Sequence, residues 1–140
     1  MEEIDRRIVE HLRADGRMSY TDLGRAMGLS TSAVHQRVRR LEERGVLTGY
    51  SARVDHAALG TPMTAFMSIT PLDPGAPDDI PERLRHLGEV EACYSVAGDE
   101  NYILKVRVAG PVALEELIAR VRGSANVATR TTVVLSTPWE

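Results

Sequence analysis

Apolar residues recur at helical spacing three times within the first 45 residues, and short polar stretches separate the three runs. The first apolar stripe is formed by Ile4, Ile8, Val9 and Leu12, and Asp15-Gly16 ends that helix. A second helix is expected over residues 20–27 and a third over residues 30–44, each with a serine at its N-cap position. The pattern therefore predicts three helices.

The break between the second and third helices is short and contains Gly28. Two helices joined by a short, glycine-containing turn are typical of a helix-turn-helix unit. Gly24 lies inside the second helix, where glycine costs about 0.5–1 kcal/mol relative to alanine. A tight crossing of the two helices explains its presence, with Val34 filling the space between them. A plain three-helix bundle is the alternative.

The periodicity changes from helical to alternating after Gly45. Residues 46–55 alternate only in part and predict a short strand or hairpin. Four further strands are expected at residues 63–70, 90–97, 102–109 and 127–135.

Two helices are expected between these strands. The first contains Leu84 and ends at Gly88, and the second begins at Pro111 and ends at Gly123. The order β-α-β-β-α-β is that of a ferredoxin-like domain, in which two helices cover one face of an antiparallel sheet. The predicted fold class is therefore α+β.

Three parts of the chain follow from these elements. Residues 1–45 are expected to form a helix-turn-helix domain, and residues 46–60 a β linker. Residues 61–140 are expected to form the ferredoxin-like domain.

Charge is segregated along the chain, which has a net charge of −3. Residues 17–53 carry seven arginines against three acids, a net of +4, whereas residues 54–140 carry seven basic and twelve acidic residues, a net of −5. This distribution favours a polyanionic partner for the N-terminal part only. A solvated, cationic helix face is the alternative.

The third helix has the composition of a DNA-reading helix. Val34, Val38 and Leu41 fix its buried face, which leaves short polar groups, His35 and Gln36 free to read base edges and arginines free to bind phosphates. The candidate DNA contacts are Ser30, Thr31, Ser32, His35, Gln36, Arg37, Arg39 and Arg40. Arg37 and Arg40 have a second interpretation, as partners of nearby carboxylates such as Asp5.

The sequence resembles the leucine-responsive regulatory protein/AsnC family of transcription regulators in residues 4–55, 88–106 and 130–135. The resemblance implies that residues 1–45 are a DNA-binding helix-turn-helix domain of the winged type, followed by the β linker. It also implies that residues 61–140 are a βαββαβ domain for ligand binding and oligomerisation, whose sheets pair into dimers. In such proteins the dimers often assemble further. A free amino acid or related small molecule often binds between dimers and alters assembly or DNA binding.

The loop at residues 96–102 is the candidate effector site. Gly98-Asp99 is a hairpin turn signal in which glycine supplies a positive φ. Exposed N–H groups there could hold a carboxylate, and nearby acids could meet an ammonium group. The family usually has Asp where this chain has Asn101, and Thr132 aligns with a residue that often borders the family's pocket. The candidate effector contacts are Gly98, Asp99, Glu100, Asn101 and Thr132.

The predicted function is sequence-specific transcription regulation by a homodimer, with higher homo-oligomers expected. Dimerisation follows because two-fold DNA sites need two reading helices about 34 Å apart, and one chain supplies one. One alternative is an AsnC-like tetrapyrrole decarboxylase that uses His86, Tyr94 or Arg107. The other is an effector-binding assembly protein without a DNA target of its own.

No cofactor is expected, and no metal site, because the four histidines lack metal-ligand spacing. Cys93 is the only cysteine and is expected to be buried in a strand. No signal peptide or membrane-spanning run is recognised, so a cytoplasmic protein without membrane contact is expected.

Overall fold

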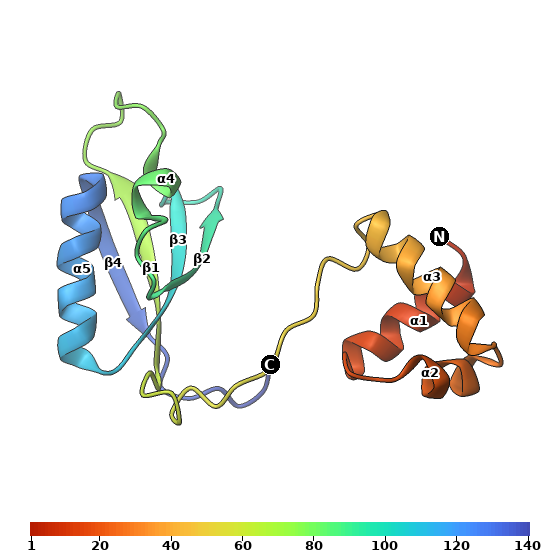
Figure 1. Ribbon diagram of the computed structural model, residues 1–140. Helices are drawn as coiled ribbons and strands as arrows, with labels where there is room; N and C mark the ends of the chain where they lie inside the picture. The colour runs from red at the N-terminus through yellow and green to blue at the C-terminus, as the bar shows by residue number, and fades with distance from the viewer. The chain divides into compact units, whose positions relative to one another are not determined.

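The computed structural model describes residues 1–140 as two compact units, Met1–Val54 and Asp55–Glu140 (Figure 1). The first unit contains the helices α1 (Glu3–Ala14), α2 (Tyr20–Met27) and α3 (Thr31–Glu43). The second contains β1 (Met63–Pro71), α4 (Ile80–Leu84), β2 (Val90–Ser95), β3 (Tyr102–Val108), α5 (Pro111–Ala125) and β4 (Val127–Val133). This order confirms the α+β prediction.

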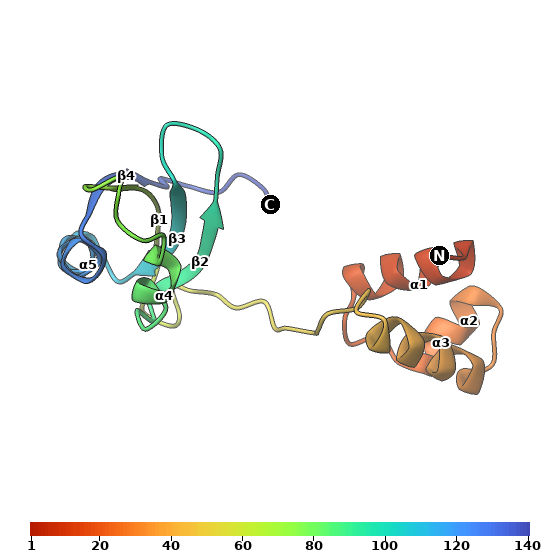
Figure 2. The same ribbon diagram turned by 90° about the horizontal axis from the view of Figure 1, so that it is seen from above.

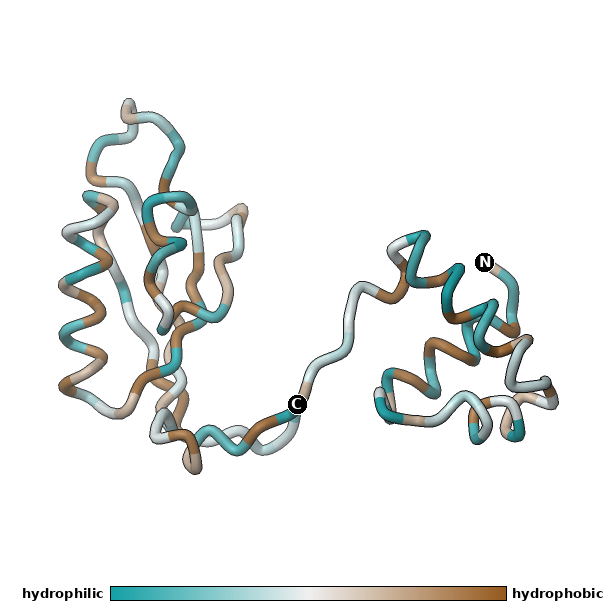
Figure 3. Tube along the Cα trace, viewed as in Figure 1, coloured by the Kyte–Doolittle hydropathy of each residue, from teal (hydrophilic) through white to brown (hydrophobic).

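The three helices of the first unit pack around one apolar cluster. Ile8 from α1, Leu23 from α2, and Val34 and Val38 from α3 are fully buried. Along each helix, hydrophobic positions alternate with hydrophilic ones at helical spacing (Figure 3). The predicted apolar stripes therefore form the core of this unit.

The turn between α2 and α3 confirms the interpretation of Gly24. A Cβ atom at that position would lie 2.6 Å from the carbonyl oxygen of Leu29. Leu29 in turn donates its N–H to the carbonyl of Gly24 at 2.8 Å. Gly28 ends α2 with a positive φ of 70°. Only glycine admits so close an approach of turn and helix.

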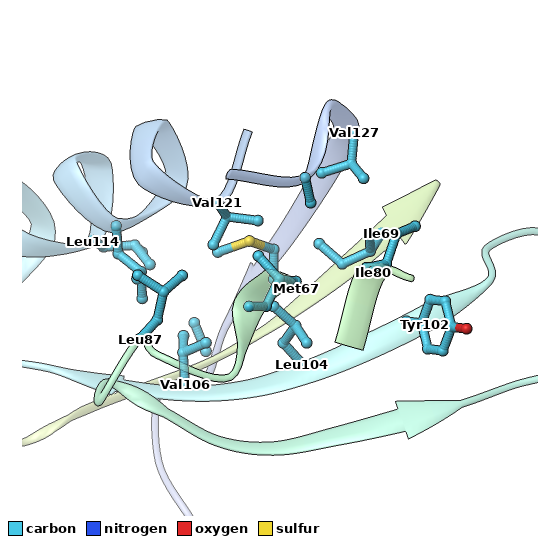
Figure 4. Close-up of a cluster of buried hydrophobic side chains, with 14 of the residues drawn as sticks. Met67, Ile69, Ile80, Leu87, Tyr102, Leu104, Val106, Leu114, Val121 and Val127 are labelled. Carbon is cyan, nitrogen blue, oxygen red and sulfur yellow. The ribbon is translucent and has the colours of Figure 1, made fainter. Parts of the chain in front are cut away.

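The second unit is a four-stranded antiparallel sheet in the order β2-β3-β1-β4. Helices α4 and α5 cover one of its faces (Figure 2). Met67, Leu104 and Val106 of the sheet pack with Leu114 and Val121 of α5 in the core on that side (Figure 4). The other face carries alternating residues that no helix covers.

The prediction of a strand in the β linker is wrong for this structure, because residues 46–60 form neither helix nor strand. A strand needs a neighbour to accept its backbone hydrogen bonds. No backbone hydrogen bond joins residues 48–54 to any other segment. Partial alternation alone could not supply that partner.

Two smaller predictions are also wrong. Helix α5 continues through Gly123 and ends at Asn126, which takes the left-handed conformation with φ 51°. A Cβ at Gly123 would meet nothing within 4 Å, so that glycine neither ends the helix nor enables a close contact. Cys93 is exposed rather than buried, because β2 is an edge strand that the helices cover only in part.

Candidate DNA-reading helix and effector loop

Helix α3 presents a polar face to solvent. The Ser30 hydroxyl caps it by accepting the N–H of Ala33 at 3.2 Å. Because Val34, Val38 and Leu41 are buried, the opposite faces are exposed. The exposed candidate residues are Ser30, Thr31, Ser32, His35, Gln36, Arg39 and Arg40.

The start of α2 extends this face, which the sequence analysis did not predict. The rings of Tyr20 and His35 lie 5.4 Å apart at 51°, and the hydroxyls of Thr21 and Thr31 are 3.5 Å apart. In helix-turn-helix proteins the first helix crosses the DNA backbone. That rule, applied to the predicted N-cap at Ser19, could have identified Tyr20 and Thr21.

Arg37 differs from the other candidates. Its Nη1 donates to Asp5 Oδ1 at 2.9 Å and to Glu2 Oε2 at 3.4 Å, and its side chain is only 23% exposed. The hydrogen bond that the Arg37 guanidinium donates to Asp5 raises the pKa of Arg37. The structure thus favours the second interpretation of Arg37: it holds α3 on α1.

Arg39 and Arg40 remain accessible to a phosphate. Arg39 Nε donates to Glu43 Oε1 at 3.0 Å, but both side chains are well exposed, so the pair is weak and exchangeable. Arg40 has no carboxylate partner and is exposed. The seven exposed candidates therefore form one accessible polar surface that carries two arginines.

The β2–β3 connection is a six-residue loop, residues 96–101. Val96 donates its N–H to the carbonyl of Asn101 at 3.1 Å, and Asn101 donates its own to the carbonyl of Ile69 at 3.0 Å. The prediction of a positive φ at Gly98 is wrong. A loop of this length reverses the chain without the two-residue turn that would require one.

Asn101 lines a cavity of about 230 Å³ together with the segment that follows β1. Its other walls are Thr70, Pro71, Pro74, Ala76, Pro77, Asp78 and Ile80. The Tyr102 hydroxyl donates to Asp78 Oδ1 at 2.6 Å, and this bond raises the pKa of Tyr102 to about 12. The Asp78 carboxylate therefore places a negative charge beside Asn101.

The remaining effector candidates lie elsewhere. Gly98 and Asp99 are exposed in the loop, and Glu100 is half-buried. Thr132 pairs with Phe66 of β1, which places it on the sheet face that no helix covers. The cavity beside Asn101 includes neither Thr132 nor Gly98.

The residues of the decarboxylase alternative do not form one site. The Arg107 guanidinium is held by Glu91 at 2.6 Å and by the Thr64 hydroxyl at 2.9 Å. Tyr94 pairs with Ile103 on the uncovered sheet face, whereas His86 follows α4 on the opposite side. No group of three or more His, Cys, Asp or Glu side chains could hold a metal ion. None of the helices combines the length and the apolar composition of a membrane span.

Family models match both units of the chain. Residues 1–42 match the AsnC-type helix-turn-helix domain, and residues 64–140 match the Lrp/AsnC ligand binding domain. The chain belongs to the Lrp/AsnC family. It is therefore a transcription regulator of the Lrp/AsnC type rather than an enzyme.

Relatives cover nearly all of this Lrp/AsnC chain. It is 56% identical over 137 residues to the HTH-type transcriptional regulator LrpA of Mycobacterium tuberculosis, covering 98% of this chain and 91% of that protein. It is 37% identical over 121 residues to the leucine-responsive regulatory protein of Escherichia coli, covering 84% of this chain and 73% of that protein.

Solved structures agree with the fold of both units. The feast or famine regulatory protein of M. tuberculosis complexed with L-methionine gives a TM-score of 0.97 at 55% identity, over 99% of this chain and 95% of that one. E. coli AsnC gives a TM-score of 0.86 at 28% identity, over 100% of this chain and 95% of that one.

Proposed function

We propose that this Lrp/AsnC regulator reads a two-fold DNA site with α3 of two subunits, under the control of a free amino acid, in the cytoplasm where such DNA lies. The exposed polar face of α3 carries the proposal, because it joins base-reading groups to two accessible arginines on one helix. Ser30, Thr31, Ser32, His35 and Gln36 would face the bases, with Arg39 and Arg40 on phosphates.

Fluorescence anisotropy with a labelled duplex from upstream of the protein's own gene tests the reading role. Gln36→Ala should weaken specific binding by about 5- to 150-fold, since a bidentate base contact contributes about 1–3 kcal/mol. Arg40→Ala should weaken specific and scrambled duplexes alike and reduce the salt slope by about 0.9. Glu10→Ala, an exposed change on α1, is the control. Unchanged discrimination in Gln36→Ala would overturn the assignment.

Dimerisation is supported by the uncovered face of the sheet. Phe66 of β1 is 38% exposed and Tyr94 of the edge strand β2 is 50% exposed there, whereas Ala65, Met67 and Ile69 on the other face of β1 are buried. Burying such side chains against a second copy removes apolar surface from water. The second copy also supplies the second reading helix, and the homodimer can assemble further into higher homo-oligomers.

The amino-acid effector is supported by the cavity beside Asn101 and by the relative solved with L-methionine. Its volume of about 230 Å³ lies below the roughly 300–1,000 Å³ of drug-sized ligand pockets, which suits a small molecule. Asp78 would bind the ammonium group, taking over the charge that Asn101 lacks. The carboxylate would extend out of the cavity to the loop N–H groups near Gly98, Asp99 and Glu100, which do not line it. Thr132 remains a candidate only if assembly brings the uncovered face to the ligand.

Calorimetric titration with each of the twenty amino acids tests this assignment. Asp78→Asn should abolish the binding heat, because the ammonium group of the ligand loses a charge-assisted hydrogen bond. Asn101→Asp should raise the affinity, because the ammonium group gains one. Glu115→Gln, which neutralises an exposed carboxylate on α5, should change nothing. Undiminished binding by Asp78→Asn would contradict the role of that carboxylate.

A further inference from the structure

A basic cleft of about 710 Å³ lies in the helical unit, outside the face formed by α3. One wall is the end of α1 and its connection to α2, residues 12–17, and the other is the extended segment at residues 49–53. Both walls belong to the compact unit that ends at Val54. The cleft is therefore a feature of the DNA-binding unit itself.

The charge of the cleft is unbalanced. Arg13, Arg17 and Arg53 line it, and Asp15 is its only acidic residue. The Asp15 carboxylate already accepts the backbone N–H of Arg17 at 3.0 Å. None of the three guanidinium groups has a carboxylate within ion-pair distance, whereas Arg37 in the same unit does. Unpaired cations that converge on one cleft attract an anion.

The backbone of the second wall also offers donors. Residues 49–53 make no backbone hydrogen bond, so their N–H groups remain free toward the cleft or solvent. Tyr50 packs over the first wall, where its Cδ1 would lie 3.8 Å from a Cβ placed on Gly16. Arginine side chains together with backbone N–H groups are the donors that DNA-binding proteins use on phosphate oxygens.

The cleft is continuous with the face that α3 presents. A neighbouring hollow of about 370 Å³ shares Gly16, Arg17 and Tyr50 with it and reaches Tyr20 at the start of α2. The Tyr20 ring in turn contacts His35 of α3. A polyanion bound along α3 can thus continue past the start of α2 into the cleft.

We propose that Arg13, Arg17 and Arg53 bind backbone phosphates of the DNA flanking the half-site that α3 reads, an inference that rests on the proposed DNA-binding function. The cleft adds affinity without sequence information, because phosphate contacts position a protein and carry no base readout. Its contribution depends on the length of the duplex and on salt. A site for a small free anion would depend on neither duplex length nor flanking DNA.

Two duplexes distinguish these cases: one limited to the specific site, and one extended by a helical turn on each side. The cleft variant is Arg17→Ala/Arg53→Ala, and the matched control is Arg6→Ala/Arg7→Ala, which removes two exposed α1 arginines outside the cleft. Anisotropy titrations at several salt concentrations give the slope of log affinity against log salt, and circular dichroism checks that each variant folds.

For the extended duplex, the cleft variant should lose about 1.8 from the magnitude of the salt slope per subunit, two phosphates at about 0.9 each. The short duplex and the control variant should keep the wild-type slope. Arg17→Lys/Arg53→Lys should restore it, because lysine still binds phosphate as a point charge.

An unchanged slope on the extended duplex, or equal losses on both duplexes, would overturn the cleft proposal. A competition with inorganic phosphate at constant ionic strength could also overturn the proposal. If phosphate displaced the extended duplex from the wild type but not from the cleft variant, the cleft would be a site for a free anion. Failure of the proposed function is distinct, because wild type would then not discriminate the short specific duplex from a scrambled one.

Discussion

Gly24→Ala tests how closely α2 packs on the turn before α3. The new Cβ would lie 2.6 Å from the Leu29 carbonyl oxygen, about 0.8 Å inside van der Waals contact. The obstacle is backbone, which cannot rotate away, so the turn must move. Overpacking of this kind costs about 1–3 kcal/mol, and the better helix propensity of alanine returns about 0.5–1 kcal/mol. Because backbone must move, the cost falls in the upper half of that range, about 2–3 kcal/mol, and a net destabilisation of about 1–2.5 kcal/mol is expected.

Gly123→Ala is the matched control, since Gly123 lies inside α5 and its Cβ would meet nothing within 4 Å. The same substitution should there stabilise the protein by about 0.5–1 kcal/mol. Urea unfolding followed by circular dichroism gives the free energies. Hydrogen exchange locates the effects in α1–α3 for Gly24→Ala and in α5 for Gly123→Ala. A neutral or stabilising Gly24→Ala would refute the argument from close approach.

Three further outcomes are expected. Ser30→Ala should cost about 1 kcal/mol of α3 stability and weaken DNA binding through fraying of the helix start, measured by urea unfolding and anisotropy; full stability would show that the cap is dispensable. The hydrogen bond from Arg120 lowers the pKa of Glu89 below its usual 4.5. This ion pair therefore contributes to the stability of the fold above pH 4.5, and the contribution is lost as pH falls through the lowered pKa. Arg120→Gln should remove that part of the acid dependence of unfolding, and an identical pH profile would contradict the pairing. Asp78→Asn should return the pKa of Tyr102 from about 12 toward 10, as measured by ultraviolet absorbance, whereas an unmoved titration would exclude the carboxylate as its cause.

Local signals were sufficient for the helical unit. Helical spacing, two serine caps and the glycine after α2 are properties of neighbouring residues, so they predicted α1, α2 and α3 to within a residue or two. The prediction that α5 ends at Gly123 was wrong, because a helix tolerates an interior glycine at modest cost when packing stabilises its other residues. The prediction of a strand in the linker was wrong, because a strand requires a hydrogen-bonded neighbour and residues 46–60 pair with no other strand of the chain.

The candidate site depended more on tertiary pairing. Arg37 lies 32 residues from Asp5, and only the packing of α3 on α1 brings the two together. Tyr102 and Asp78 are 24 residues apart and meet because β3 pairs with β1, whose following loop carries the acid. Residues so far apart in the sequence form no local pattern from which either contact could be predicted. The exposed face of α3, by contrast, could be predicted because its buried face repeats every three or four residues.

Selection from a random duplex library tests the central claim, that α3 reads bases, without knowledge of any target gene. Wild-type protein should enrich a two-fold motif whose half-sites lie one helical turn or a multiple apart. The variant His35→Ala/Gln36→Ala should keep its fold and its salt-dependent binding but lose the preference at one or two positions of each half-site. Failure of the wild type to enrich any motif, or an identical motif from the variant, would contradict the account.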